Sequence, residues 1–171
     1  QETMSAPVSV QGDLFSSSSS ATPSSPLLPN KTETLVVLKN IDSTKHDYQL
    51  IDSQEKRKII ISELKNIKSF CFDTETTSLE EMDAEVLGIA ISYENNKAYY
   101  VNMPENFEET KAILGEFKDL FADSKIEKIA QNLKYDLKVL LKYDIHLAGP
   151  QFDTMLAHYL ANPDGRHSMD I

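Results

Sequence analysis

The stretch KSFCFDTE, residues 68–75, decides the fold class, because it is typical of a strand whose two faces differ in chemistry. Side chains alternate across a strand, so Phe70 and Phe72 share one face. Asp73 and Glu75 share the opposite face, and at ~3.3 Å per residue they lie about 7 Å apart. Two carboxylates this close repel each other unless a cation lies between them. The stretch therefore predicts a buried strand that carries a cation site near its end.

The remaining apolar periodicity predicts four more strands and four helices around this stretch. In chain order they are a strand at 47–51, a helix at 55–67, strands at 85–93 and 97–103, a helix at 106–123, a strand at 126–131, and helices at 132–144 and 152–162. Three consecutive strands followed by a helix and a further strand fit a mixed sheet flanked by helices, an α/β or α+β architecture.

Residues 1–34 differ in composition from the rest of the chain. The tract SSSSSATPSSPLLP, residues 16–29, is rich in Ser and Pro and buries too little apolar area to offset the entropy of ordering. We expect residues 1–34 to be a flexible linker between domains and residues 35–171 to be one domain. The start at Gln1 and the final residues 166–171, RHSMDI, are those expected of a piece of a longer protein.

Charge, cysteine content and hydropathy exclude several classes of protein. A formal net charge of −10 argues against a domain that grips nucleic acid by bulk electrostatics, because phosphate binding depends on clustered Lys and Arg. The single cysteine, Cys71, excludes an internal disulfide, and its place in an apolar strand predicts a reduced, packed thiol. No run approaches the roughly 18 apolar residues of a membrane span, and no secretion signal is present. We therefore expect a cytoplasmic protein without a membrane partner.

A third acid lies where the last predicted strand turns into a helix. In QNLKYD, residues 131–136, Asn132 and Asp136 are four residues apart, a spacing that stacks side chains on one helical face. If this strand pairs beside the first acidic strand, Asp136 faces Asp73 and Glu75 across the end of the sheet.

Three carboxylates without a Cys or His cluster form an all-oxygen site, which favours Mg²⁺ or Mn²⁺ over zinc. Two such ions, bridged by one acid, activate a water molecule on one side of a phosphodiester and stabilise the leaving oxygen on the other. An isolated Asp-x-Glu is weak evidence for this chemistry, because acidic chains contain it by chance.

Three segments, in order, resemble the 3′→5′ exonuclease domain of the bacterial family A DNA polymerases, the DNA polymerase I family. They are FDTETTSLEEMDAEVLGIAIS at 72–92, AQNLKYDLKVL at 130–140 and FDTMLAHYLANPDGRHSMDI at 152–171. The resemblance covers residues 68–171 and implies a ribonuclease H-like fold, which agrees with the predicted order of elements. It also implies proofreading hydrolysis at single-stranded 3′ ends of DNA with two Mg²⁺ or Mn²⁺ ions.

The resemblance also implies roles for individual residues. Asp73 would bridge the two metals, Glu75 would ligate the first metal, and Asp136 would hold the second, partly through water. Leu79 would wedge against the terminal base. The side chains that would line the path of the terminal nucleotides are Thr76, Gln131, Asn132 and Tyr135.

One departure from the family concerns its third motif, Tyr-x-x-x-Asp, which supplies a fourth acid and lies beyond the segment where this chain stops. His167 and Asp170 in HSMD are three residues apart and do not fit it. We therefore expect an incomplete metal site and little activity in this chain alone. The same resemblance implies a polymerase domain after it and a 5′ nuclease domain before it.

Two other functions are compatible with these residues. An exoribonuclease of the same superfamily would use the same chemistry and differ in how the site treats the 2′-hydroxyl. A vestigial domain kept as a scaffold would need no acids, and three retained carboxylates argue against it because they repel one another. An interaction module without a nucleic-acid role is the third and weakest alternative.

Several other polar residues are expected to be structural. Asp153 precedes a helix and is typical of an N-cap. The stripe of Lys134, Lys138 and Lys142 is expected to be solvated. The histidines at 46, 146 and 158 are assigned no catalytic role, and a turn with a salt-bridge cluster is expected of Asp164, Arg166 and His167.

Overall fold

A computed structural model describes residues 40–168, which form a six-stranded sheet and five helices. The linker expected at residues 1–34 lies outside the described residues. The strands are β1 (Asp47–Ile51), β2 (Ser69–Thr76), β3 (Val86–Glu94), β4 (Lys97–Asn102), β5 (Glu127–Ala130) and β6 (Gln151–Asp153). The helices are α1 (Gln54–Leu64), α2 (Phe107–Glu116), α3 (Lys118–Phe121), α4 (Leu133–Leu141) and α5 (Thr154–Ala161). Within residues 40–168, no helix is long and apolar enough to cross a membrane.

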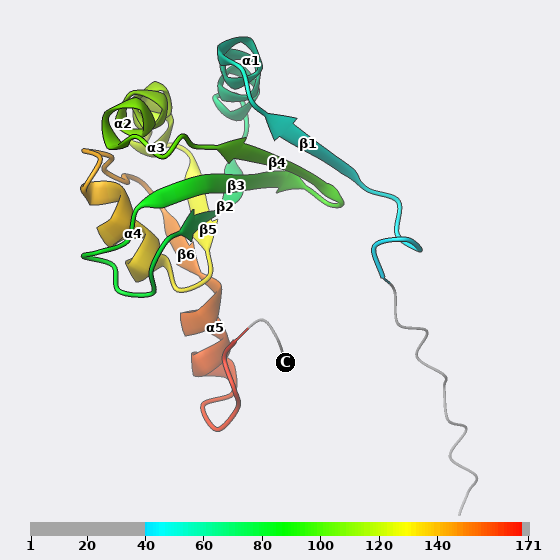
Figure 1. The fold of residues 1–171 in the computed structure, drawn as a ribbon. Helices are drawn as coiled ribbons and strands as arrows, with labels where there is room; N and C mark the ends of the chain where they lie inside the picture. The colour runs from blue at the N-terminus through cyan, green and yellow to red at the C-terminus, as the bar shows by residue number, and fades with distance from the viewer. Residues whose placement is uncertain (1–39, 169–171) are drawn as a thin grey trace, which may run out of the picture. The chain divides into compact units, whose positions relative to one another are not determined.

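The sheet is mixed, with the strand order β1-β4-β3-β2-β5-β6 (Figure 1). β2 pairs antiparallel with β3, and β3 pairs antiparallel with β4, as expected for three consecutive strands. The pairs β1–β4, β2–β5 and β5–β6 are parallel. The expected mixed sheet with helices is confirmed. Because β2 and β5 are parallel neighbours, their carboxyl ends lie at the same edge of the sheet.

Two elements differ from the prediction. The helix expected at 106–123 is divided into α2 and α3 at Phe117, whose N–H bonds to the carbonyl of Leu114 at 2.9 Å, a tighter turn than an α-helix makes. The helix expected at 152–162 begins at Thr154, because the residues before it form β6, in which Asp153 pairs with Ala130. Three residues are too few to show the alternation that identifies a strand.

The hydrophobic core lies on one face of the sheet and includes buried residues from α1 to α4. Phe70 and Phe72 of β2 pack edge-on against Phe121 of α3, with ring centroids 5.8 and 5.1 Å apart. Leu64 of α1 and Leu140 of α4 are fully buried in the same core. The predicted division of β2 into an apolar face and an acidic face is therefore confirmed.

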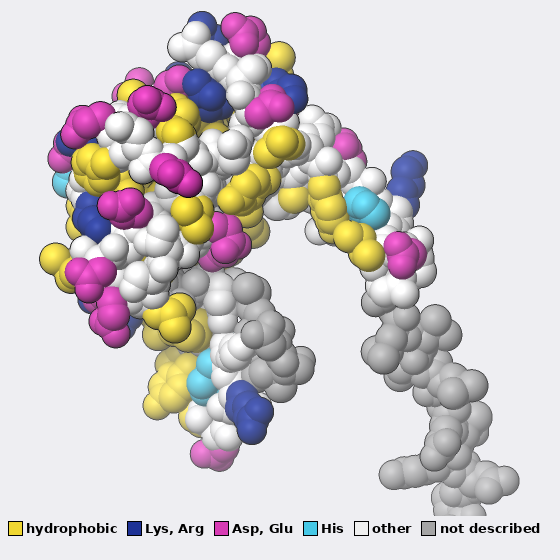
Figure 2. Space-filling view, in the orientation of Figure 1, with side chains coloured by type: hydrophobic (Ala, Val, Ile, Leu, Met, Phe, Trp, Pro, Cys, Tyr) yellow, Lys and Arg dark blue, Asp and Glu magenta, His cyan; other side chains and the backbone are white. Residues whose placement is uncertain are grey.

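The opposite face, which we call the open face of the sheet, is more accessible to solvent. Cys71 is exposed on it, so the expectation of a packed thiol is wrong. The reason is that the core helices α1 to α4 cover the other face. At the outer strands of the open face, Tyr48 and Phe152 are 58% and 46% exposed. Figure 2 shows hydrophobic side chains along β1 and beside α5, while acidic side chains are spread over α2 and the loop between β2 and β3.

Lys128 of β5 is a fully buried cation that ties the sheet to two loops. Its Nζ donates to the backbone carbonyls of Ile126 and Ala148, each at 2.9 Å, and to the carbonyl of Asp123. Burial lowers the pKa of Lys128 from its ordinary value, while the charge of Asp123 acts in the opposite direction. The ammonium group joins the loop before β5 to the loop before β6, and so ties these parallel strands together at their amino ends, opposite the end that carries Asp73 and Glu75.

Candidate functional site

The carboxyl ends of β2 and β5 open into a pocket of about 380 Å³. All eight residues expected to act in catalysis or binding line this pocket, although they come from segments about 60 positions apart in the chain. The lining residues are Asp73, Thr74, Glu75, Thr76, Thr77, Ser78, Leu79, Gln131, Asn132, Tyr135 and Asp136. The parallel pairing of β2 with β5 is the feature that brings them together.

The two acids of β2 differ in their exposure. Asp73 is half-buried and Glu75 is exposed, and both lie on the open face. Burial raises the pKa of Asp73 above its ordinary value, and the nearby charge of Glu75 raises it further. A register shift between Glu75 and Thr76 interrupts the pairing with β3 at this point, so the strand ends directly after the two acids.

Asp136, in the first turn of α4, is only 2% exposed. Its Oδ1 accepts hydrogen bonds from the hydroxyl and the backbone N–H of Thr74, at 2.5 and 3.2 Å. Burial raises the pKa of Asp136 to about 6; the Thr74 bonds oppose this shift, and the charges of Asp73 and Asp153 add to it. Asp136 therefore lies beside Asp73 and Glu75, and the buried Thr74 fixes its side chain.

Thr74 is a site residue that the sequence analysis missed. It lies between Asp73 and Glu75 but points to the buried face of β2, where it is 7% exposed. A buried hydroxyl in an otherwise apolar row requires a partner. The sequence therefore indicates that Thr74 needs a hydrogen-bond partner. It does not identify the partner, Asp136, which is 62 residues away along the chain.

The loop after β2 is fastened to α4 by Tyr135. The Tyr135 hydroxyl donates a hydrogen bond to the carbonyl of Ser78. The hydroxyl oxygens of Tyr135 and Thr76 lie 2.6 Å apart. Thr76 also donates to the Ser78 carbonyl at 3.0 Å. Leu79, the next residue, is 93% exposed at the edge of the pocket. Its apolar side chain is therefore accessible at the edge of the pocket.

Lys138 of α4 and Lys142, the C-cap residue of α4, hold the same loop. The expectation of a solvated lysine stripe is met by Lys134 and Lys138, which are exposed, but not by Lys142, which is half-buried. Lys138 pairs with Glu81, and Lys142 donates to the carbonyls of Met82 and Ala84 at 2.9 and 2.6 Å. The loop carbonyls could not be identified as partners from the helical spacing of the lysines alone.

Gln131 and Asn132 form the turn between β5 and α4. The Gln131 side chain accepts a hydrogen bond from the hydroxyl of Thr154 and donates to the carbonyl of His167 at 2.7 Å. Asn132 has a left-handed backbone (φ 56°, ψ 46°) and precedes the helix. The expectation that Asn132 and Asp136 stack on one helical face is therefore wrong, although both line the pocket.

The segment after α5 forms a turn, as expected, in which the N–H of Gly165 bonds to the carbonyl of Asn162 at 3.1 Å. The expected salt-bridge cluster is not formed, since none of the ion pairs within residues 40–168 includes Asp164 or Arg166. Instead the Nδ1 atoms of His158 and His167 lie 3.1 Å apart.

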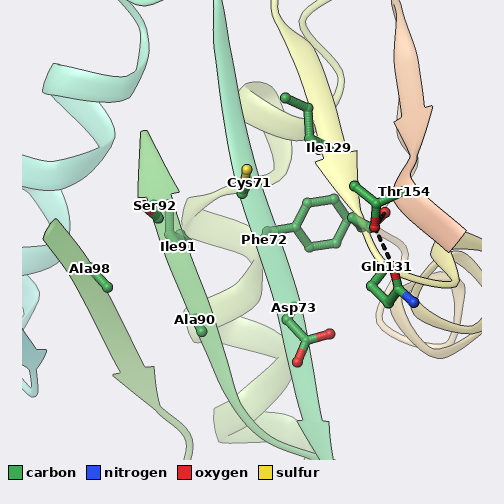
Figure 3. Close-up of a pocket in the computed structure, with 11 residues that line it drawn as sticks. Cys71, Phe72, Asp73, Ala90, Ile91, Ser92, Ala98, Ile129, Gln131 and Thr154 are labelled. Atoms are coloured by element: carbon green, nitrogen blue, oxygen red, sulfur yellow. Dashed lines mark hydrogen bonds between the residues drawn. The ribbon is translucent and has the colours of Figure 1, made fainter. Parts of the chain in front are cut away.

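A second, apolar pocket on the open face adjoins the acidic one and shares Asp73 and Gln131 with it (Figure 3). Further along this face, Gly88 pairs with Glu75, and a Cβ at Gly88 would lie 2.1 Å from the Tyr100 hydroxyl oxygen. The absence of a side chain at Gly88 lets the Tyr100 ring lie beside the acids. Burial raises the pKa of Tyr100, and the charge of Glu75 adds to the shift.

The donors of the acidic pocket suit a hard divalent cation. Its three acidic residues, Asp73, Glu75 and Asp136, offer carboxylate oxygens as ligands. Neither His nor Cys is among the lining residues. Burial and neighbouring negative charges raise the pKa values of Asp73 and Asp136, and none of the ion pairs within residues 40–168 includes either carboxylate. Within residues 40–168, however, no group of three His, Cys, Asp or Glu side chains is already arranged to hold a metal ion.

Comparison with known proteins identifies the family. Residues 48–171 match the family model described as 3′-5′ exonuclease. The chain is 32% identical over 143 residues to DNA polymerase I of Borreliella burgdorferi, a match that covers 82% of this chain and 16% of that protein. It is 33% identical over 134 residues to DNA polymerase I of Pseudomonas aeruginosa, covering 72% and 15%. The chain therefore spans about one sixth of the length of these relatives.

Solved structures support the fold. The chain is similar to Brucella melitensis NrnC, with a TM-score of 0.57 and 20% identity over 74% of this chain and 57% of that one. It is also similar to the catalytic core of RRP6 from Trypanosoma brucei, with a TM-score of 0.57 and 20% identity over 72% and 32%. The expected ribonuclease H-like fold is confirmed. From the family match and the polymerase relatives, the chain belongs to the 3′-5′ exonuclease family of DNA polymerase I.

Proposed function

We propose that this domain removes nucleotides one at a time from single-stranded 3′ ends of DNA, as the proofreading site of a DNA polymerase I. The observation that carries the proposal is the convergence of Asp73, Glu75 and Asp136 on one pocket beside the exposed Leu79. The family match gives the reaction class, and the polymerase relatives favour DNA as the substrate.

The three acids have distinct tasks in this proposal. Asp73 and Glu75 would hold divalent cations, Mg²⁺ or Mn²⁺, from the open side of the pocket. Asp136 would contribute its second carboxylate oxygen, because its Oδ1 is already bonded to Thr74. When bound, two such cations supply an activated water and neutralise charge on the phosphodiester.

The other lining residues would position the strand. Leu79 would pack against the terminal base, since its side chain is almost fully exposed on a loop held by Tyr135. Thr76, Gln131, Asn132 and Tyr135 would line the path of the terminal nucleotides. Because the net charge is −10, attraction of DNA to the domain would depend on the bound cations and on neighbouring domains.

The relatives are several times longer than this chain, so its context is also a proposal. We propose that a polymerase domain follows it, that a 5′ nuclease domain precedes it through the linker at residues 1–34, and that the whole protein acts in the cytoplasm. We further propose that activity requires the family's third motif, Tyr-x-x-x-Asp, from a longer chain.

An exoribonuclease of the same superfamily is the second candidate. The fold supports it equally, because the solved structures similar to this chain include RNase D from Trypanosoma brucei in complex with RNA U12, at a TM-score of 0.55 and 16% identity. The sequence relatives at 32 and 33% identity are DNA polymerases, which favours DNA.

The test follows shortening of a 5′-labelled single strand, as DNA and as RNA of the same sequence, with Mg²⁺ or Mn²⁺. It compares this chain with a chain extended past Ile171 to the length of the relatives, and adds the variants Asp73→Ala and Glu75→Ala. Glu94→Ala is the matched control, since this exposed acid lies at the other end of β3. Binding of Mn²⁺, measured by electron paramagnetic resonance, gives a readout independent of cleavage.

Stepwise shortening of DNA from the 3′ end that is lost in both site variants and kept in Glu94→Ala would support the proposal. Shortening of RNA but not of DNA would favour the exoribonuclease. An extended chain that shortens neither strand and binds no Mn²⁺ would contradict an enzymatic role and leave a polymerase scaffold as the better function.

A further inference from the structure

The turn between β5 and α4 does not contain the side-chain hydrogen-bond acceptor that the start of α4 needs. Asn132 is the N-cap residue of α4, yet its side chain makes no capping hydrogen bond, and its backbone is left-handed, a conformation that Asn adopts more readily than most residues other than Gly. The first N–H groups of a helix have no partner within the helix. Another part of the chain must therefore supply their acceptors.

Asp153, at the end of β6, supplies them. Its Oδ1 accepts from the backbone N–H of Asn132 at 3.2 Å, and its Oδ2 accepts from that of Leu133 at 3.0 Å. The same carboxylate also caps its own helix, because Oδ1 accepts from Met155 and Leu156 at 2.9 and 3.2 Å. One carboxylate thus serves the N-termini of α4 and α5, where the helix dipoles favour a negative charge.

Thr154, the next residue, holds the same turn from the strand side. Its hydroxyl lies 3.3 Å from the carbonyl of Ala130 and bonds to the side chain of Gln131 (Figure 3). Asp153 and Thr154 together form what we call the β6–α5 clamp. The clamp contacts each of the four residues from Ala130 to Leu133, which connect β5 to α4.

We propose that Asp153 is a positioning residue of the nuclease site, which fixes the turn at Asn132 and the start of α4 and thereby places Asp136 in the pocket. Asp136 lies three residues after Leu133, within the first turn of the helix that the clamp begins. A shift of that turn moves Asp136 away from Thr74 and the acids of β2. In this proposal Asp153 contacts neither metal nor substrate. Only its expected effect on cleavage rests on the proposed function.

Substitution of Asp153 by Asn distinguishes its hydrogen bonds to α4 from its hydrogen bonds to α5. Asp153→Asn keeps one carbonyl oxygen in the place of Oδ1, so Met155, Leu156 and Asn132 retain an acceptor. It replaces Oδ2 by an NH₂ group, which cannot accept from Leu133. Asp153→Ser keeps only a local cap for α5, because the shorter side chain does not reach α4. Ser53→Ala is the matched control, since Ser53 is the N-cap of α1, remote from the pocket.

Hydrogen exchange of backbone amides in this chain is the first measurement. Asp153→Asn is expected to speed exchange at Leu133 about tenfold and at Met155 less than twofold, and Asp153→Ser is expected to speed exchange at both Asn132 and Leu133. Ser53→Ala is expected to change exchange only in α1. Unchanged exchange at Asn132 and Leu133 in both Asp153 variants would overturn the proposal, whether or not the protein is a nuclease.

Metal affinity and kinetics are the second measurement. Outer-shell partners of metal ligands are typically worth 10–100-fold in affinity or rate, so Asp153→Asn is expected to weaken Mn²⁺ binding about tenfold. In the extended chain it should lower kcat about tenfold with KM changed less than twofold, while Ser53→Ala leaves both unchanged. Equal effects of Asp153→Asn and Ser53→Ala would reduce Asp153 to an ordinary helix cap and overturn the proposal. Absence of Mn²⁺ binding and cleavage in the unsubstituted protein would contradict the proposed function instead, and the exchange data would still decide the role of the clamp.

Discussion

The buried carboxylate of Asp136 should contribute a loss of stability as the pH rises from acidic to neutral, and Asp136→Asn should remove that contribution. Its pKa is about 6 in the folded chain, against an ordinary value of 3.8. The folded chain therefore holds this proton more tightly than the unfolded chain does. Between pH 3.8 and pH 6 the folded state binds more protons, so its stability falls as pH rises through that window.

The size of the effect follows from the shift. One pKa unit corresponds to about 1.4 kcal/mol, so the difference between 3.8 and about 6 corresponds to about 3 kcal/mol. Asn keeps a carbonyl oxygen that can accept both Thr74 bonds, and it carries no charge. At pH 8 without divalent cations, Asp136→Asn should therefore raise the free energy of unfolding by about 3 kcal/mol, with little gain near pH 3.8.

Urea unfolding in EDTA at both pH values measures this. With an m-value of about 1.5 kcal/mol/M, the midpoint of the variant at pH 8 should rise by about 2 M. Asp119→Asn, an exposed acid at the start of α3, is the control and should change stability by less than about 0.5 kcal/mol at either pH. A variant that is less stable at pH 8, or that differs from the unsubstituted chain equally at both pH values, would refute the reasoning.

Three further changes test other parts of the structure. Lys128→Met leaves three carbonyls without their buried cation and should lower the free energy of unfolding by about 3 kcal/mol, measured by thermal unfolding; no loss would contradict its structural role. Leu79→Ala should leave stability within about 0.5 kcal/mol and weaken single-stranded DNA binding by the extended chain about fivefold, measured by fluorescence anisotropy; equal affinity would remove Leu79 from the site. Arg57→Ala breaks a half-buried bidentate pair with Glu116 and should cost about 2 kcal/mol, with positive coupling in a double-mutant cycle.

The fold could be predicted from sequence where periodicity is strong. The alternation around Asp73 gave both faces of β2, and the apolar stripes gave the main helices in their observed order. β6 was missed because it is short and runs directly into a helix. The exposure of Cys71 was missed because an apolar strand does not show whether both faces of its sheet are covered.

The site could be predicted as a set of residues but not as a set of contacts. Asp73, Glu75 and Asp136 were identified by their chemistry and by family motifs, and they line one pocket. Asp153 was correctly predicted to cap α5, but its bonds to the start of α4 join residues about 20 positions apart. The role of Thr74 likewise depends on a partner from a distant helix. Such contacts follow from the pairing of β2, β5 and β6, which local sequence does not encode.

The open face of the sheet also makes this protein spectroscopically addressable. Cys71 is the only thiol in the sequence, it is exposed, and it lies on the same face of β2 as Asp73, about 7 Å away along the strand. Partial burial raises the pKa of its thiol, so coupling to a maleimide proceeds best at mildly alkaline pH. A nitroxide attached there is close enough for bound Mn²⁺ to broaden its spectrum. A single native side chain can thus report occupancy of the acidic pocket without any engineered cysteine.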